Sequence, residues 1–147
     1  MLNPVAQEHY TGCFVSCVAM LLDLNYREAL KLLHPDKDIS YLDIHGFRCT
    51  NMEDDVHRLL GNLGFKSHTG RYKKFCSYKR WVKKNAIMII RWDCEPNTCH
   101  CILYDADGKQ FIDPDGGYII GEYTEKCFQR QLEVPIIIDS IPDLRLA

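Results

Sequence analysis

The sequence lacks the features that define several large classes of protein. No apolar run approaches the ~20 residues that cross a bilayer, and the chain opens without the basic stretch and apolar block of a secretory signal. Basic and acidic residues nearly balance, at 18 against 20, so no global charge favours nucleic acid or an anionic membrane. We therefore expect a protein that is cytoplasmic as synthesised, with no membrane segment. Export by a route without a cleaved signal stays open.

The composition that is present fits one globular domain over residues 1–147. Hydrophobic residues make up 46% and charged residues 26% of the chain, without repeats or low-complexity tracts. A chain of this length buries roughly 70% of the surface that its unfolded form exposes. We expect a single domain with a substantial core.

Eight cysteines are the most unusual part of this composition, and none of them forms a Cys-x-x-Cys pair. An even number of cysteines in a small secreted chain would indicate disulfides. Because the sequence shows no signal and predicts a large core, reduced thiols are the better expectation, most of them buried.

The hydrophobic pattern changes from helical to extended along the chain. Residues 13–24 are apolar on nearly every face, which is typical of a helix that is buried all round. Further helices are expected over 27–33, from a cap at Thr50 or Asn51 to a stop at Gly64, and over 77–84. Strands are expected over 86–92, 98–104, 110–113, 118–120 and 134–138. This order predicts an α+β domain in which the buried N-terminal helix packs on an antiparallel sheet.

Cys13 lies in the first turn of that buried helix, directly after Gly12. Unpaired backbone N–H groups and the positive end of the helix dipole favour a thiolate at this position. A thiolate is the nucleophilic form of cysteine, but catalysis also requires a proton carrier and a donor for the oxyanion.

His100 is the one histidine of six within a predicted strand, and the following hairpin brings Asp113 near it. A four-residue loop over 105–108 places Asp113 opposite His100. A two-residue turn at 107–108 places Asp113 opposite Ile102, diagonal to His100 and on the same face. A three-residue loop with a bulge would break this relation. In the first two registers the carboxylate is able to orient the imidazole.

Gln7 and the start of the buried helix resemble a known family. The spacing of Gln7 and Cys13, followed by Cys17, Ala19 and Met20, is similar to the opening of the bacteriocin-processing, double-glycine leader peptidases. These bacterial enzymes are a compact branch of the papain-like cysteine peptidases. His100 at the start of an apolar strand, Asp113 after the next strand, and Leu-Gly-Phe at 63–65 extend the resemblance.

The resemblance implies a papain-like fold and a Cys-His-Asp triad that needs no cofactor or metal. Cys13 would be the nucleophile, His100 the general base and Asp113 the orienting residue. Gln7, whose side-chain amide is an N–H donor, would bind the oxyanion together with the Cys13 N–H. The substrate would be a peptide or protein, cleaved through an acyl-enzyme.

Three other interpretations remain at the level of the sequence. Related triads also serve glutamine deamidases and acyl transferases that act on a partner protein, some of them bacterial effectors. The segment 66–84 contains eight basic residues, no acid and several aromatics, which suits an acidic partner or, less well, single-stranded nucleic acid. A binding module that uses this segment is therefore a non-enzymatic alternative.

Two readings of the other cysteines are less favoured. Cys94, Cys99, His100 and Cys101 lie close together in sequence, but strand alternation points Cys99 and Cys101 away from the side of His100, which argues against zinc. Cys17, one helical turn after Cys13, is expected to be a buried core residue rather than a redox partner.

Overall fold

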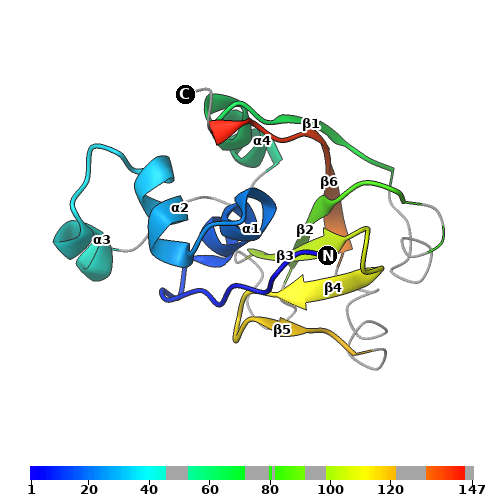
Figure 1. The fold of residues 1–147 in the computed structure, drawn as a ribbon, viewed down its shortest axis with the longest axis horizontal. Coiled ribbons are helices and arrows are strands. Elements are labelled where there is room, and N and C mark those ends of the chain that lie inside the picture. Colours follow the sequence, from blue (N-terminus) through cyan, green and yellow to red (C-terminus); the bar gives the residue numbers. More distant parts are fainter. Residues whose placement is uncertain (46–52, 72–79, 81, 92–98, 122–131, 145–147) are drawn as a thin grey trace.

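The computed structural model describes residues 1–45, 53–71, 80, 82–91, 99–121 and 132–144 (Figure 1). Within these residues the chain forms four helices followed by six strands. The elements in chain order are α1 (Cys13–Leu22), α2 (Tyr26–Leu33), α3 (Ile39–His45), α4 (Glu53–Asn62), β1 (Lys66–Thr69), β2 (Ala86–Arg91), β3 (Cys99–Asp105), β4 (Gln110–Asp113), β5 (Tyr118–Ile119) and β6 (Leu132–Ser140). The predicted mixed α+β class is confirmed. None of the described helices is long and apolar enough to cross a membrane.

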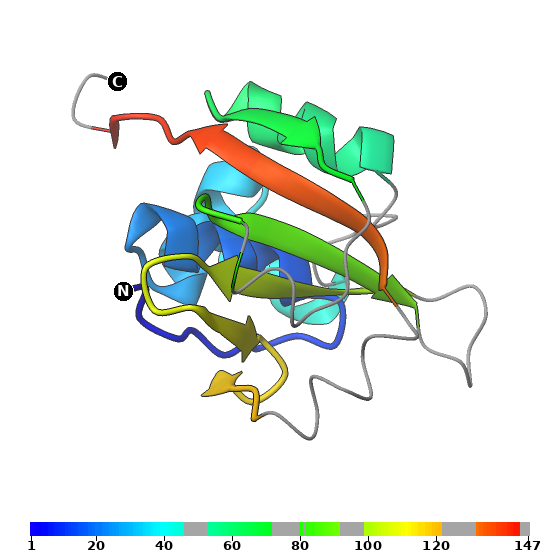
Figure 2. The same cartoon turned by 90° about the vertical axis from the view of Figure 1, so that its right-hand side faces the viewer.

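The six strands form one sheet in the order β1-β6-β2-β3-β4-β5 (Figure 2). Every pair of neighbouring strands is antiparallel. Helix α1 packs against β3, while α4 packs against β1 and β6 nearer the other end of the sheet. The predicted arrangement, a buried N-terminal helix on an antiparallel sheet, is therefore the observed one.

Both faces of the central strands are buried. Successive residues of each strand point to opposite faces and so belong to two different hydrophobic clusters. Ile87 and Ile89 of β2 join the cluster that contains α1, α2 and α4. Ala86, Met88 and Ile90 belong to a second cluster on the opposite face. Burial on both faces explains why this strand is a continuous apolar run in the sequence.

Helix α1 is buried along its length because the sequence offers it no polar face. Every residue from Cys13 to Leu21 is buried. The helix ends at Leu22, two residues earlier than predicted, since Asp23 takes a left-handed conformation with φ of 55°. The N–H groups of Asp23 and Leu24 then satisfy the carbonyls of Met20 and Ala19, which closes the helix.

The other predicted helices agree in part. Helix α2 begins one residue before the predicted start, because Asn25 and Glu28 form a reciprocal capping box. Helix α4 corresponds to the third predicted helix, whose cap at Thr50 or Asn51 lies outside the described residues. Half of the predicted 77–84 helix also lies outside them; of the other residues, 80 is helical and 82–84 are not.

The predicted strands lie close to the observed ones, and two elements were not predicted. Strand β4 has the predicted bounds, β5 ends one residue early, and β6 extends further at both ends than predicted. Residues 92 and 98, predicted as strand ends, lie outside the described residues. Helix α3 and the polar strand β1 have no counterpart in the prediction.

The hairpin of β3 and β4 has the register that was predicted for a two-residue turn. Tyr104 pairs with Phe111, and Asp105 pairs with Gln110. The loop nevertheless has four residues, 106–109, instead of two. The buried Asp105 carboxylate fixes this loop by accepting hydrogen bonds from the Gly108 N–H and the Gln110 side chain. The register that places Asp113 directly opposite His100 was wrong, whereas the diagonal arrangement was correct.

Candidate active site

Cys13 begins α1, and its side chain is almost completely buried, with 3% of its surface exposed. The residue before it, Gly12, occupies the N-cap position, and its N–H donates to the carbonyl of His9. A side chain at position 12 would clash with the Tyr26 hydroxyl, so glycine is required for this close approach. The turn places the Cys13 side chain at the N-terminus of α1, beside the positive end of the helix dipole.

His100 and Asp113 lie on adjoining strands and form a buried pair. His100 Nε2 donates to Asp113 Oδ1 at 2.7 Å, and the two residues are 6% and 4% exposed. The carboxylate also accepts the Asp115 N–H at 2.9 Å, and the Tyr118 hydroxyl lies 3.5 Å from Oδ2. Several donors thus hold Asp113 in one orientation, and Asp113 in turn fixes the His100 ring.

His100 is hydrogen-bonded to the Cys13 side chain as well. Asp113 occupies Nε2 of the ring, and the Cys13 side chain is a second partner of the same imidazole. The structure therefore aligns a thiol, an imidazole and a carboxylate in series, with the imidazole in the middle.

Electrostatics favour charge separation within this series. Burial lowers the pKa of His100, but the hydrogen bonds to Asp113 and Cys13 outweigh it and raise the pKa to about 9. The pKa of Cys13 is held well below its ordinary value by a hydrogen bond from Cys101, against the opposing effect of burial, and with a further contribution from His100. Between these two pKa values the stable form is a thiolate beside an imidazolium.

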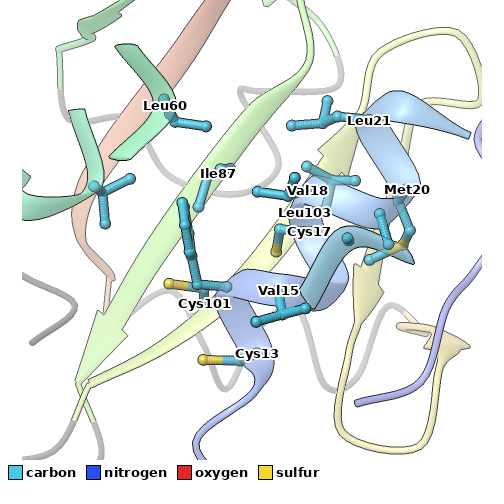
Figure 3. Close-up of a cluster of buried hydrophobic side chains, with 14 of the residues drawn as sticks. Cys13, Val15, Cys17, Val18, Met20, Leu21, Leu60, Ile87, Cys101 and Leu103 are labelled. Carbon is cyan, nitrogen blue, oxygen red and sulfur yellow. The ribbon is translucent and has the colours of Figure 1, made fainter. Parts of the chain in front are cut away.

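Cys101 is the neighbour of Cys13 that sequence reasoning did not assign to the site. Its side chain is fully buried in the same hydrophobic cluster as Cys13, and it lowers the pKa of Cys13. Figure 3 shows the sulfur atoms of Cys13 and Cys101 extending toward the same side of α1. In the sequence, the only feature that could have indicated this role is the position of Cys101, directly after His100 in the strand that packs against α1.

Gln7 lies near Asp113, but its side-chain N–H groups do not point toward Cys13, His100 or Asp113. Its backbone N–H donates to the carbonyl of Pro114 at 2.8 Å, which joins the N-terminal segment to the turn after β4. The side-chain Nε2 donates to the carbonyls of His9 and Tyr10, both at 3.0 Å. Its Oε1 is buried without a hydrogen-bond partner.

The remaining sequence candidates do not converge on a second site in the part of the chain that is described. Cys17 is fully buried, and burial raises the pKa of its thiol, so it remains protonated. Cys94 lies outside the described residues, which contain no cluster of three possible metal ligands. Much of the basic segment 66–84 also lies outside them, and Lys84 is paired with Asp139 of the same chain. An acidic partner for this segment thus gains no support.

Comparison with known proteins supports the fold. No family model matches the sequence, and no curated protein matches it. Among solved structures, the chain is similar to the peptidase domain of Streptococcus ComA, described as a bifunctional ABC transporter involved in a quorum-sensing pathway. The two share 16% sequence identity with a TM-score of 0.55, and the match covers 97% of this chain and 100% of that domain.

The fold is therefore similar to that of a known peptidase domain. The resemblance predicted from the sequence is confirmed at the level of the fold. Membership of the sequence family is not shown, because the identity is low and no family model matches.

Proposed function

We propose that this protein is a cysteine peptidase with Cys13 as the nucleophile, His100 as the general base and acid, and Asp113 as the orienting residue. The observation that carries the proposal is the buried series in which His100 bonds Asp113 at 2.7 Å and also bonds the Cys13 side chain. The peptidase-domain fold supports the same activity.

The reaction follows from the charge state of the pair. The Cys13 thiolate attacks the carbonyl carbon of a peptide bond, and the C–N bond breaks as His100 gives its proton to the leaving amine. A water molecule then transfers a proton to His100 and attacks the thioester, which releases the acid product and restores the thiolate. Asp113 keeps the imidazole oriented through both steps.

The oxyanion would be bound by the Cys13 N–H, which lies at the start of α1, and by the Gln7 amide. Gln7 Nε2 donates to the carbonyls of His9 and Tyr10 in the free protein. Substrate binding must therefore divert one of its hydrogens from these carbonyls. The short segment 7–12 is the part of the chain that would adjust.

The direct test is hydrolysis of a peptide library by the wild type, Cys13→Ala and Cys17→Ala. The two variants remove a buried thiol from the same helix, so they are matched in packing loss. We expect Cys13→Ala to lose turnover and Cys17→Ala to retain it, with both proteins folded by circular dichroism. Hydrolysis by Cys13→Ala at the wild-type rate would contradict the assignment of Cys13 as the nucleophile.

The same samples distinguish peptide cleavage from its chemical relatives. Release of ammonia without chain cleavage, dependent on Cys13, would show glutamine deamidation in place of peptidase activity. Transfer of an acyl group to an added amine without hydrolysis would show an acyl transferase. Either result keeps the thiolate mechanism and overturns the peptidase assignment.

A further inference from the structure

The segment directly before the nucleophile forms a tight turn that also holds the Gln7 side chain. The turn is closed by the Gly12 N–H, which donates to the carbonyl of His9 at 2.9 Å. The same carbonyl accepts a hydrogen bond from Gln7 Nε2 at 3.0 Å, and the carbonyl of Tyr10 accepts another from Nε2, also at 3.0 Å. The two carbonyls therefore determine where the Gln7 amide lies relative to Cys13.

The His9 ring attaches this turn to two helices. Its Nδ1 lies 2.8 Å from the Tyr26 hydroxyl of α2, and its Nε2 lies 3.2 Å from Asp43 Oδ1 of α3. Hydrogen bonds from Arg27 and His9 lower the pKa of Asp43, so its carboxylate is ionised and accepts from Nε2. Burial raises the pKa of Tyr26 to about 12, so its hydroxyl keeps the proton that it donates to Nδ1. A neutral imidazole thus satisfies both partners.

Tyr26 contacts both ends of the turn. Its hydroxyl bonds the His9 ring at one end, and at the other end a Cβ added to Gly12 would lie 2.1 Å from the same hydroxyl. The next residue of α2, Arg27, binds Glu8 Oε1 at 3.0 Å, so the residue before His9 is held to the same helix. Helix α2 therefore positions the turn that precedes the nucleophile.

We propose that His9 is a positioning residue for the oxyanion donor: its carbonyl keeps its hydrogen bond to Gln7 Nε2 during the reaction, while the Tyr10 carbonyl gives up the other hydrogen to the oxyanion. The inference rests on the proposed function, because the orientation of Gln7 matters only if an oxyanion forms at Cys13. It adds a residue outside the Cys-His-Asp series that acts through Gln7 without touching the substrate.

The two carbonyls that hold Gln7 are not equivalent. The bond to the His9 carbonyl is partly buried, and His9 itself is fixed through Tyr26 and Asp43. Tyr10 is 85% exposed, and its bond to Gln7 lies at the surface, where water is able to replace Gln7 as the donor. Exchange of the Tyr10 bond therefore costs less, and the His9 bond remains to orient the amide.

This arrangement should affect the chemical step more than substrate binding. The oxyanion exists in the tetrahedral intermediate and not in the bound substrate, so the orientation of Gln7 affects kcat more than KM. Removing an oxyanion donor lowers kcat by about 10²- to 10³-fold, and Gln7→Ala should lose about that much. His9→Ala keeps the donor but releases the turn that orients it, so a smaller loss of about tenfold is expected.

The test is a double-mutant cycle on peptide hydrolysis, with the most rapidly cleaved peptide of the library as substrate. It compares the wild type, His9→Ala, Gln7→Ala and the double variant. Because His9 acts through Gln7, His9→Ala should lower kcat about tenfold at nearly unchanged KM in the wild type. In the Gln7→Ala background it should have no further effect, since the group that it positions is absent.

His57→Ala is the matched control. The His57 ring also bonds other side chains through both nitrogens, Ser67 at 2.7 Å and Thr69 at 2.9 Å, but these contacts join α4 to β1. Its loss removes a comparable pair of hydrogen bonds and leaves the turn before the nucleophile intact, so kcat should be unchanged.

Two outcomes overturn the inference. An unchanged kcat in His9→Ala would show that the ring does not position the donor. An equal fold loss of kcat in the wild-type and Gln7→Ala backgrounds would show that His9 does not act through Gln7. If His9→Ala fails to fold, Tyr26→Phe takes its place in the cycle, because it removes the hydroxyl that holds the His9 ring and keeps the aromatic packing.

Alkylation of Cys13 by iodoacetamide separates this inference from the proposed function. The reagent reacts at a saturated carbon and forms no oxyanion, so Cys13 should be labelled equally fast in the wild type and His9→Ala; slower labelling in His9→Ala would contradict action through Gln7. Hydrolysis that depends on Cys13, with unchanged kcat in His9→Ala, would leave the proposed function standing and remove the inference. Absence of Cys13-dependent hydrolysis in the wild type would remove both.

Discussion

Replacing Asp113 with asparagine tests how the His100 imidazolium is stabilised. The substitution keeps the shape of the side chain and an oxygen that accepts the His100 Nε2–H, which lies 2.7 Å from Oδ1 in the wild type. It removes the negative charge alone. The pKa of His100 should therefore fall, while the imidazole keeps its orientation.

The size of the fall follows from the structure. A rise of the His100 pKa from 6.5 to about 9 corresponds to about 3 kcal/mol of preference for the charged ring, at about 1.4 kcal/mol per pKa unit. Asp113 and Cys13 share this effect, with the hydrogen bond to Asp113 the larger of the two. A charged acceptor contributes about 1 to 2 kcal/mol more than a neutral one, so we expect a fall of about one pKa unit in Asp113→Asn.

The assay is an NMR titration of the histidine ring protons, with the His100 signal identified by its absence from a His100→Gln variant. The imidazolium is required for the ion pair, so the alkaline limb of peptidase activity should lie near pH 9 in the wild type and move down by the same amount in Asp113→Asn. A His100 that titrates near 6.5 in the wild type, or at the same pH in both proteins, would refute this reasoning.

Two further predictions concern the segment that carries Cys13 and the helix after it. Gly12→Ala forces its new methyl group against the Tyr26 hydroxyl and should destabilise the protein by about 1 to 3 kcal/mol. The control is Gly61→Ala in α4, where the added carbon has no neighbouring element within 4 Å. In urea unfolding it should be neutral or stabilising by up to about 1 kcal/mol. Equal losses of stability in the two variants would contradict the clash at position 12. Asn25→Ala removes the capping box with Glu28 and should cost about 1 kcal/mol in the same assay, and an unchanged midpoint would show that the box contributes nothing.

The elements that could be predicted are those whose sequence pattern admits one interpretation. The all-apolar run that begins at Cys13 predicts a buried helix, and only its end was misplaced, because Asp23 turns left-handed. Strand β1 could not be predicted, since Lys66, Ser67, His68 and Thr69 are mostly exposed and lie at the edge of the sheet. Pairing with β6 makes this segment a strand, and such long-range pairing leaves no periodic signal in a polar sequence.

The candidate site was predictable where it depends on strand register. The predicted hairpin placed His100 and Asp113 on one face of the sheet. The observed pairing of Leu103 with Ile112 has the same register, in which Asp113 is diagonal to His100. The orientation of the Gln7 amide was not predictable, because it depends on which backbone carbonyls lie beside it in the folded loop. The influence of Cys101 on the pKa of Cys13 was equally hidden, since it depends on how α1 packs against β3.

The central claim is that Cys13 is a thiolate at neutral pH and is paired with the His100 imidazolium. Alkylation with limiting iodoacetamide at mildly acidic pH, with peptide mapping of all eight cysteines, tests it directly. A free thiol has a pKa of ~8.5 and reacts slowly under these conditions. The account predicts that Cys13 is labelled first in the wild type and loses this preference in His100→Ala. Labelling of Cys13 no faster than the other cysteines, or an unchanged preference in His100→Ala, would contradict it.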